Sequence, residues 1–125
     1  MYPSSVDNYY QAVEAYMLNN NVPDLKISNK EYGIVVGHSL GGGVAQIVAA
    51  RLYEGGRKNV LSIGISSPGT VLSSQKFGFD PESLSFTSVT IAGKRDPVPM
   101  VDEHAGLMEF VECDRTVDVM CHETK

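Results

Sequence analysis

The ten residues YGIVVGHSLG at positions 32–41 decide the fold of this 125-residue chain. The first six, Tyr32 to Gly37, form a short apolar run rich in β-branched residues, which predicts a strand buried on both faces of a parallel sheet. From Leu40 the apolar residues recur at helical spacing until Gly55 and Gly56 end the pattern. The stretch therefore predicts a buried strand that turns directly into a helix.

Ser39 stands at that turn, within a G-x-S-x-G pattern formed by positions 37–41. In this pattern the serine takes a strained backbone conformation that pushes its hydroxyl into the open. The first N–H groups of the helix, beginning with that of Leu40, then face a developing oxyanion. We expect Gly37 and Gly41 because side chains at these positions would collide where strand and helix meet. The alternative is a glycine-rich turn whose serine merely caps the helix.

The segments around this turn predict a single α/β domain. Helical spacing of apolar residues predicts a helix over about 4–20, which begins at a capping box formed by Ser4 and Asp7. Apolar runs predict further strands at 59–65, 85–92 and 107–113, with a loop or short helix after the first of them. Strands that alternate with helices indicate a mostly parallel sheet with flanking helices and right-handed crossovers.

Asp96 is the candidate acid, and two histidines are candidate bases. A serine hydroxyl becomes a good nucleophile when a histidine accepts its proton and an acid orients that histidine. In folds that carry such a turn, the three catalytic residues follow one another along the chain in the order serine, acid, histidine. Asp96 follows the third predicted strand in a loop stiffened by Pro97 and Pro99, although a solvated turn aspartate would look the same. His104 and His122 both satisfy the order, and the longer spacing from Asp96 favours His122.

The third histidine, His38, lies inside the turn beside Ser39. We expect its side chain to project away from the serine hydroxyl, in a structural or site-lining role.

The run Cys121-His122-Glu123 is not expected to bind a metal, because neighbouring residues rarely converge on one ion and the chain has no second cluster.

Composition and charge argue against several classes of protein. The net charge of −5 gives no reason to expect that the chain binds nucleic acid, or that it binds an anionic membrane by charge alone. No apolar run approaches the roughly 18 residues that span a bilayer, and the start MYPSS lacks the features of a signal peptide. Cys113 and Cys121 are expected to be reduced thiols unless the compartment is oxidising.

The motifs of this chain resemble those of one family. GHSLGG at 37–42 resembles the serine elbow of the class 3, fungal-type lipases, and DPVP at 96–99 resembles their acid loop. SPG at 67–69, DPVPM at 96–100 and CH at 121–122 are similar to the APG, DPIPM and CH-x-GK elements of the autophagy-related vacuolar phospholipases in that superfamily. The resemblance runs from the helix at Ser4 to the last residue. It implies a partial α/β-hydrolase fold and a triad of Ser39, Asp96 and His122.

Two departures from the family pattern have consequences. Glu123-Thr124-Lys125 follow His122 without the family's glycine. Only about thirty residues precede the elbow, where the family has several strands, a lid and the source of its second oxyanion donor. The resemblance therefore implies that residues 1–125 are the C-terminal part of a lipase-type domain. The strand before Ser39 would then have an unpaired hydrophobic edge, which favours pairing with another chain.

The leading functional hypothesis is a serine hydrolase that cleaves carboxylic ester bonds of lipids, either triacylglycerol or phospholipid, through an acyl-enzyme intermediate. It would need no metal or organic cofactor and could act on substrate at a membrane surface. An esterase or acyltransferase for small soluble esters would share every residue named above. The alternative from a different class is an inactive, lipase-derived protein that binds lipid or a partner. The subgroup resemblance implies a vacuole-like, lysosome-like or secretory location.

Overall fold

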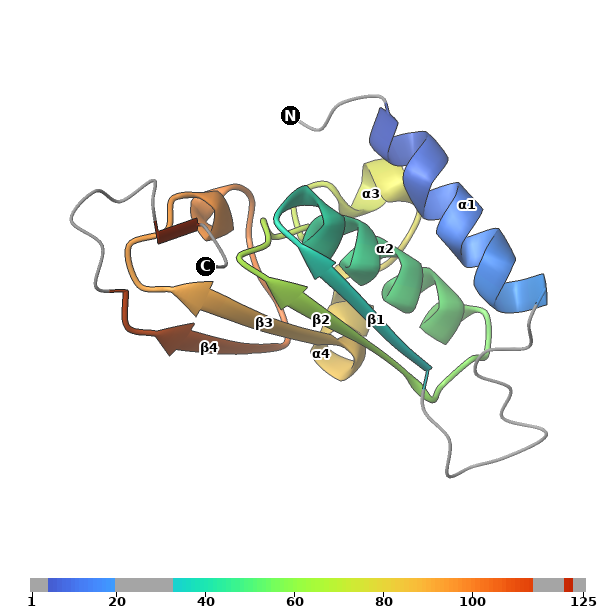
Figure 1. Cartoon of the computed structure of the whole chain (residues 1–125). Coiled ribbons are helices and arrows are strands. Elements are labelled where there is room, and N and C mark those ends of the chain that lie inside the picture. The colour runs from blue at the N-terminus through green and yellow to red at the C-terminus, as the bar shows by residue number, and fades with distance from the viewer. Residues whose placement is uncertain (1–4, 20–32, 114–120, 123–125) are drawn as a thin grey trace.

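The computed structural model describes residues 5–19, 33–113 and 121–122. Four parallel strands form one sheet in the order β1-β2-β3-β4 (Figure 1). The strands are β1 (Gly33–His38), β2 (Val60–Ile65), β3 (Ser88–Gly93) and β4 (Leu107–Val111). The helices are α1 (Ser5–Asn19), α2 (Leu40–Glu54), α3 (Ser74–Phe77) and α4 (Leu84–Thr87), with 3₁₀ turns at Pro81–Ser83 and Val98–Met100. No helix within the described ranges is long and apolar enough to cross a membrane.

This architecture confirms the predicted α/β class and the parallel sheet. The strand and helix around Ser39 lie within about one residue of their predicted bounds, while Tyr32 and the capping residue Ser4 lie outside the described residues. The third strand was expected from residue 85 but begins at Ser88. The residues before it form α4 instead, because Leu84 is fully buried and the Thr87 hydroxyl donates to the carbonyl of Ser83 (3.0 Å).

The core lies between α2 and the face of the sheet that it covers. Ile47, Val48, Ala49 and Ala50 of α2 are completely buried, together with Phe77 and Leu84 from the later helices. Helix α1 packs on α2 and contributes Tyr10 and Met17 to the same core. The central position of α2 fixes the direction in which β1 ends, and thus the place of Ser39.

Arg51 connects three helices around this core. Its guanidinium donates to the carboxylate of Glu14 on α1, and Nη1 donates to the carbonyl of Phe77 at the end of α3 (2.9 Å). The hydrogen bond that Arg51 donates to Glu14 raises the pKa of Arg51. The charged form is therefore favoured, and it holds α1 against the end of α2.

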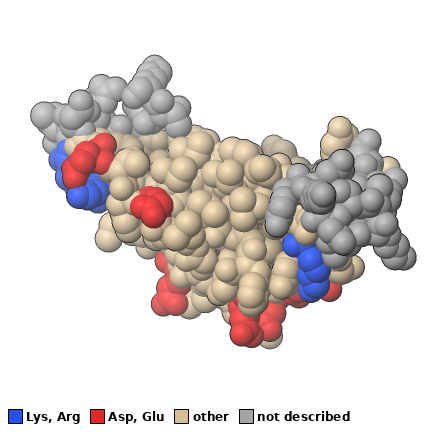
Figure 2. Space-filling view, turned by 90° about the horizontal axis from the view of Figure 1, so that it is seen from below, with Lys and Arg blue, Asp and Glu red and all other residues tan. Residues whose placement is uncertain are grey.

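The opposite face of the sheet is open, which corrects the expectation that the first strand is buried on both faces. Ile34 and Val36 of β1 are 55% and 59% exposed. The register places their side chains on one face with those of Leu61, Ile63, Val89 and Leu107, all partly or fully exposed. Figure 2 shows a broad, mostly uncharged surface on the side of the molecule away from α1. No described helix covers this face.

Candidate active site

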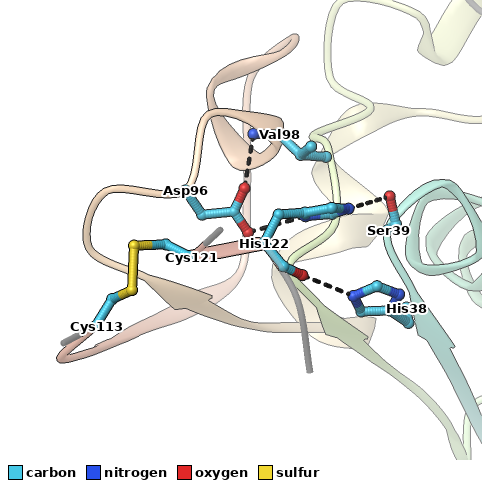
Figure 3. A network of polar contacts seen from close by, with 7 residues as sticks. All are labelled: His38, Ser39, Asp96, Val98, Cys113, Cys121 and His122. Carbon is cyan, nitrogen blue, oxygen red and sulfur yellow. Dashed lines mark hydrogen bonds and ion pairs between the residues drawn. A yellow bond between two sulfur atoms is a disulfide. The ribbon is translucent and has the colours of Figure 1, made fainter. Parts of the chain in front are cut away.

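The parallel sheet brings the predicted site residues together at one edge. Ser39 follows β1 and Asp96 follows β3, so both lie beyond the carboxyl ends of parallel strands, with β2 between them. His122 reaches the same edge from the end of the described chain, beside Cys121 (Figure 3). Such an edge is the usual place for ligands in open α/β sheets.

Ser39 has the backbone conformation expected of an elbow, with φ 57° and ψ −127°. Its N–H donates to the carbonyl of Ile65 (2.9 Å), and its own carbonyl accepts from the N–H of Gly42 (2.9 Å). The side chain makes no capping hydrogen bond to α2. The alternative of a serine that only caps the helix therefore does not fit the geometry, because the hydroxyl points elsewhere.

The Ser39 hydroxyl points at His122. Oγ lies 2.7 Å from Nε2 of His122, and Nδ1 of the same ring lies 3.0 Å from Oδ2 of Asp96 (Figure 3). The Asp96 side chain is completely buried, and that of His122 is 21% exposed. Oδ1 of Asp96 accepts from the N–H of Val98 (2.9 Å), so both carboxylate oxygens have a donor. A buried acid, a histidine and a serine are thus linked in series.

His104, the other candidate base, lies elsewhere. Its Nε2 donates to the carbonyl of Pro99 (2.7 Å), which leaves Nδ1 buried without a partner. His38 contacts the site from the other side, as its ring stacks on His122 with centroids 4.9 Å apart, and Nε2 donates to the carbonyl of His122 (3.1 Å). The His38 ring therefore lies against one face of the His122 ring. Its observed hydrogen bond goes to the His122 carbonyl and not to the serine hydroxyl.

Two polar groups that support the site were missed by the sequence analysis. Gln46, fully buried on α2, donates to Ser67 Oγ (3.0 Å) and the carbonyl of Pro68 (2.9 Å), and accepts from Thr70 (2.8 Å). It thereby fixes the loop after β2 against the middle of α2. The signal was a lone amide within an otherwise apolar stretch of helix.

Asp102 is the second such group. Its carboxylate accepts from the N–H of Leu72 (2.7 Å) and from the hydroxyl of Ser73 (2.5 Å), while its backbone φ is 63°. These bonds join the segment after the acid loop to the segment before α3. No motif in the sequence points to this contact, since its partners lie about thirty positions away.

Cys113 and Cys121 form a disulfide, so the expectation of reduced thiols was wrong for this structure (Figure 3). The bond ties the residue before His122 to the segment that follows β4. The sequence could not decide whether this disulfide forms, because its formation requires a fold that brings the two residues together and an oxidising compartment. The disulfide restrains the approach of His122 to the site.

Metal binding has no geometric support within the described part of the chain. No three side chains from His, Cys, Asp or Glu converge on one point there. Both nitrogens of the His122 ring are engaged by Asp96 and Ser39.

The two elbow glycines differ, which corrects one expectation. A Cβ on Gly37 would lie 2.1 Å from the carbonyl oxygen of Gly41, as expected from a close approach of strand and helix. A Cβ on Gly41 would meet nothing within 4 Å, so no collision explains this glycine. Gly42 is the second crowded position, because its Cβ would lie 2.3 Å from that of Ser67.

This difference gives a matched prediction. Gly37→Ala is expected to lower the free energy of unfolding by about 1–3 kcal/mol, since backbone atoms must move to make room. Gly41→Ala is expected to leave it unchanged or raise it by up to about 1 kcal/mol, because alanine is the better helix former. Urea denaturation followed by circular dichroism measures both variants. Equal destabilisation of the two would contradict the assigned packing.

The chain is similar to known proteins in its sequence and in its fold. The model of the family described as Lipase (class 3) matches residues 5–104. A search of the curated proteins found no match. Among solved structures, a lipase from Rhizopus microsporus var. chinensis is similar with 22% identity and a TM-score of 0.50, over 85% of this chain and 41% of that one.

Two further structures extend this similarity. Lipase II from Rhizopus niveus is similar with 22% identity and a TM-score of 0.53, over 83% of this chain and 44% of its own. Lip2 lipase from Yarrowia lipolytica gives 20% identity and a TM-score of 0.53, over 79% of this chain and 38% of its own. At these identities the likeness concerns the fold. The chain spans less than half the length of each of these lipases.

Proposed function

The chain belongs to the class 3 lipase family, and we propose that it is the C-terminal part of a lipase-type domain that hydrolyses carboxylic esters of lipids. The observation that carries this proposal is the series Ser39, His122 and Asp96, with contacts of 2.7 and 3.0 Å. Serine and base lie within hydrogen-bond reach, and an acid orients the base.

The proposed reaction has two steps. Ser39 Oγ attacks the carbonyl carbon of the ester while its proton passes to Nε2 of His122. The oxyanion faces the N–H of Leu40, which as the first residue of α2 has no partner within the helix. The C–O bond to the alcohol then breaks, the alcohol takes the proton from His122, and the acyl group remains on Ser39. Water, deprotonated by His122, releases the acid and restores the serine.

Asp96 and His38 have supporting roles in this proposal. Asp96 keeps the proton of His122 on Nδ1, so that Nε2 is free to accept from Ser39. Complete burial keeps water away from the Asp96 carboxylate and strengthens its interaction with the histidinium that forms. His38 packs flat on His122 and limits its rotation.

Labelling with a fluorophosphonate probe tests the proposal directly. We expect modification of the folded chain at Ser39, mapped by mass spectrometry, and its loss after heat denaturation. The other serines of the chain serve as internal controls. Comparison of short- and long-chain esters then separates a lipase from an esterase for small soluble substrates. The resemblance to autophagy-related phospholipases makes phospholipid vesicles the first surface-bound substrate to test.

A second function is favoured by the short span of the chain. The chain covers 41% and 44% of two of the lipases it resembles, so more than half of each of these lipases is not matched by this chain. A chain of this kind could bind lipid or a partner without turnover. That function predicts a folded protein that binds a hydrophobic ligand and resists the fluorophosphonate.

A further inference from the structure

His104, which the proposed reaction does not use, contacts the turn behind the acid. Its Nε2 lies 2.7 Å from the carbonyl oxygen of the buried Pro99, within the 3₁₀ turn Val98–Met100. A carbonyl only accepts, so Nε2 carries a ring proton in this contact. In the neutral ring Nδ1 is then a bare acceptor, buried without a partner among the described residues. Such an acceptor is unfavourable, so packing alone does not account for a histidine here, whereas donation to Pro99 does.

The same turn carries a donor for Asp96. The N–H of Val98 donates to Oδ1 of Asp96 (2.9 Å), while Oδ2 of that carboxylate contacts Nδ1 of His122 (3.0 Å). The residues on either side of Val98 are prolines, which have no N–H to offer in its place. A shift of this turn would therefore change the direction in which Asp96 faces His122.

The segment that bears His104 is fastened to the loop after β2. The N–H of Gly69 donates to the carbonyl of Val101 (2.9 Å), and that of Val71 donates to the carbonyl of Glu103 (3.0 Å). The two segments lie so close that a Cβ on Gly69 would be 2.1 Å from the carbonyl oxygen of Glu103. The place of His104 is therefore set by the loop after β2.

That loop is in turn held by the helix that follows the serine. Gln46 of α2 donates to Ser67 Oγ (3.0 Å) and to the carbonyl of Pro68 (2.9 Å). Contacts thus run without a break from α2, through the loop after β2, to the acid loop at residues 96–99. Ser39 directly precedes α2 and Asp96 lies in the acid loop. These contacts therefore join the serine and the acid by a route that does not pass through the base.

We propose that His104 is a positioning residue, which holds the acid loop in register with the serine elbow through the Pro99 carbonyl. Asp96 is thereby kept facing His122. The inference rests on the proposed function, because His104 acts through Asp96 and not on the reacting atoms. A misplacement of about 1 Å can lower the rate of an enzyme about 10²-fold, so a hydrogen bond at a distance from the serine can govern the reaction.

Three substitutions at this one position separate the hydrogen bond from the packing of the ring. His104→Gln keeps a donor, because the side-chain nitrogen of glutamine can take the place of Nε2. His104→Leu fills a similar space without a donor. His104→Asn is polar like glutamine, but its nitrogen lies nearer the backbone and falls short of Pro99, so it decides the test if the leucine variant does not fold. Glu103→Gln, at an exposed side chain of the same segment, is the control.

The rates test whether the donor matters. His104→Leu and His104→Asn are expected to lower kcat for a chromogenic butyrate by about 10- to 100-fold, with KM within about twofold of the native value. His104→Gln and Glu103→Gln should retain most of the native kcat. Thermal unfolding by circular dichroism identifies which variants are folded. Equal rates in the folded glutamine and asparagine variants, whether native or reduced, would overturn the proposal.

The proton on Nδ1 of His122 gives a second readout, which needs no hydrolysis. A proton held between a histidine and a buried carboxylate resonates far downfield in ¹H NMR spectra. We expect this resonance in the native chain and in His104→Gln, and its loss in His104→Asn. Its absence from the native chain, or its retention in His104→Asn, would overturn the proposal. If no variant hydrolysed an ester, the proposed function would fail while this comparison still decided the role of His104.

Discussion

Replacement of Ser39 by alanine is expected to reduce kcat for an activated ester to the background rate, a loss of up to about 10⁶-fold when measured on a fully assembled triad of this type. The reason is chemical, because alanine offers His122 no proton and the ester no nucleophile. The backbone at position 39 has a positive φ, which alanine tolerates about as poorly as serine. The fold should therefore survive while the reaction is lost.

The measurement compares hydrolysis of a chromogenic butyrate by the native chain, Ser39→Ala and Ser85→Ala. Ser85 is an exposed serine of α4, and its replacement should leave the rate unchanged. Thermal unfolding by circular dichroism confirms that all three proteins are folded. Full hydrolysis by Ser39→Ala would refute the proposed nucleophile.

The local part of the site could be predicted from the sequence because its determinants are local. An apolar β-branched run, a G-x-S-x-G turn and a helical stripe occur in succession, so the strand, the exposed hydroxyl and the helix start follow from short-range sterics. The chain order of Ser39, Asp96 and His122 then limited the candidates for the acid and the base that assist the serine. In the structure, the His122 ring contacts Ser39 Oγ through Nε2 and Asp96 Oδ2 through Nδ1.

The rest depended on contacts between distant segments. The disulfide of Cys113 and Cys121, and the bonds from Gln46 to the loop after β2, arise only when the sheet has formed. The start of β3 was misplaced because Ser85 and Phe86 were read as strand residues, whereas burial of Leu84 against α2 favours a helical turn. Tertiary packing overrides local propensity in such short segments.

The open face of the sheet shows a different limit. A continuous apolar strand predicts burial on both sides, and Ile34 and Val36 have the composition for it. Yet only one face is covered by described helices. The apolar pattern of β1 therefore predicts more burial than the described residues show, with Ile34 and Val36 exposed.

Asp96→Asn is expected to lower kcat by about 10⁴-fold while leaving the fold intact. An amide of nearly the same size fits the buried pocket and can still accept from the N–H of Val98. Its NH₂ group, however, would face Nδ1 of His122 and favour the tautomer with the proton on Nε2. In that tautomer Nε2 cannot accept the proton of Ser39, so the nucleophile is no longer activated.

Asp80→Asn provides a matched control for this substitution. Asp80 also precedes a proline, and its Oδ1 also accepts from the N–H two residues on (2.9 Å). Unlike Asp96, however, it is exposed at the surface and makes no observed hydrogen bond to His122. Its replacement should leave kcat within about twofold, because surface substitutions change stability by only about 0.5 kcal/mol or less and this one leaves the contacts of His122 in place. The rate of fluorophosphonate labelling at Ser39 should fall with kcat in Asp96→Asn alone. If Asp96→Asn stayed within tenfold of the native rate, His122 would be oriented by something other than this carboxylate.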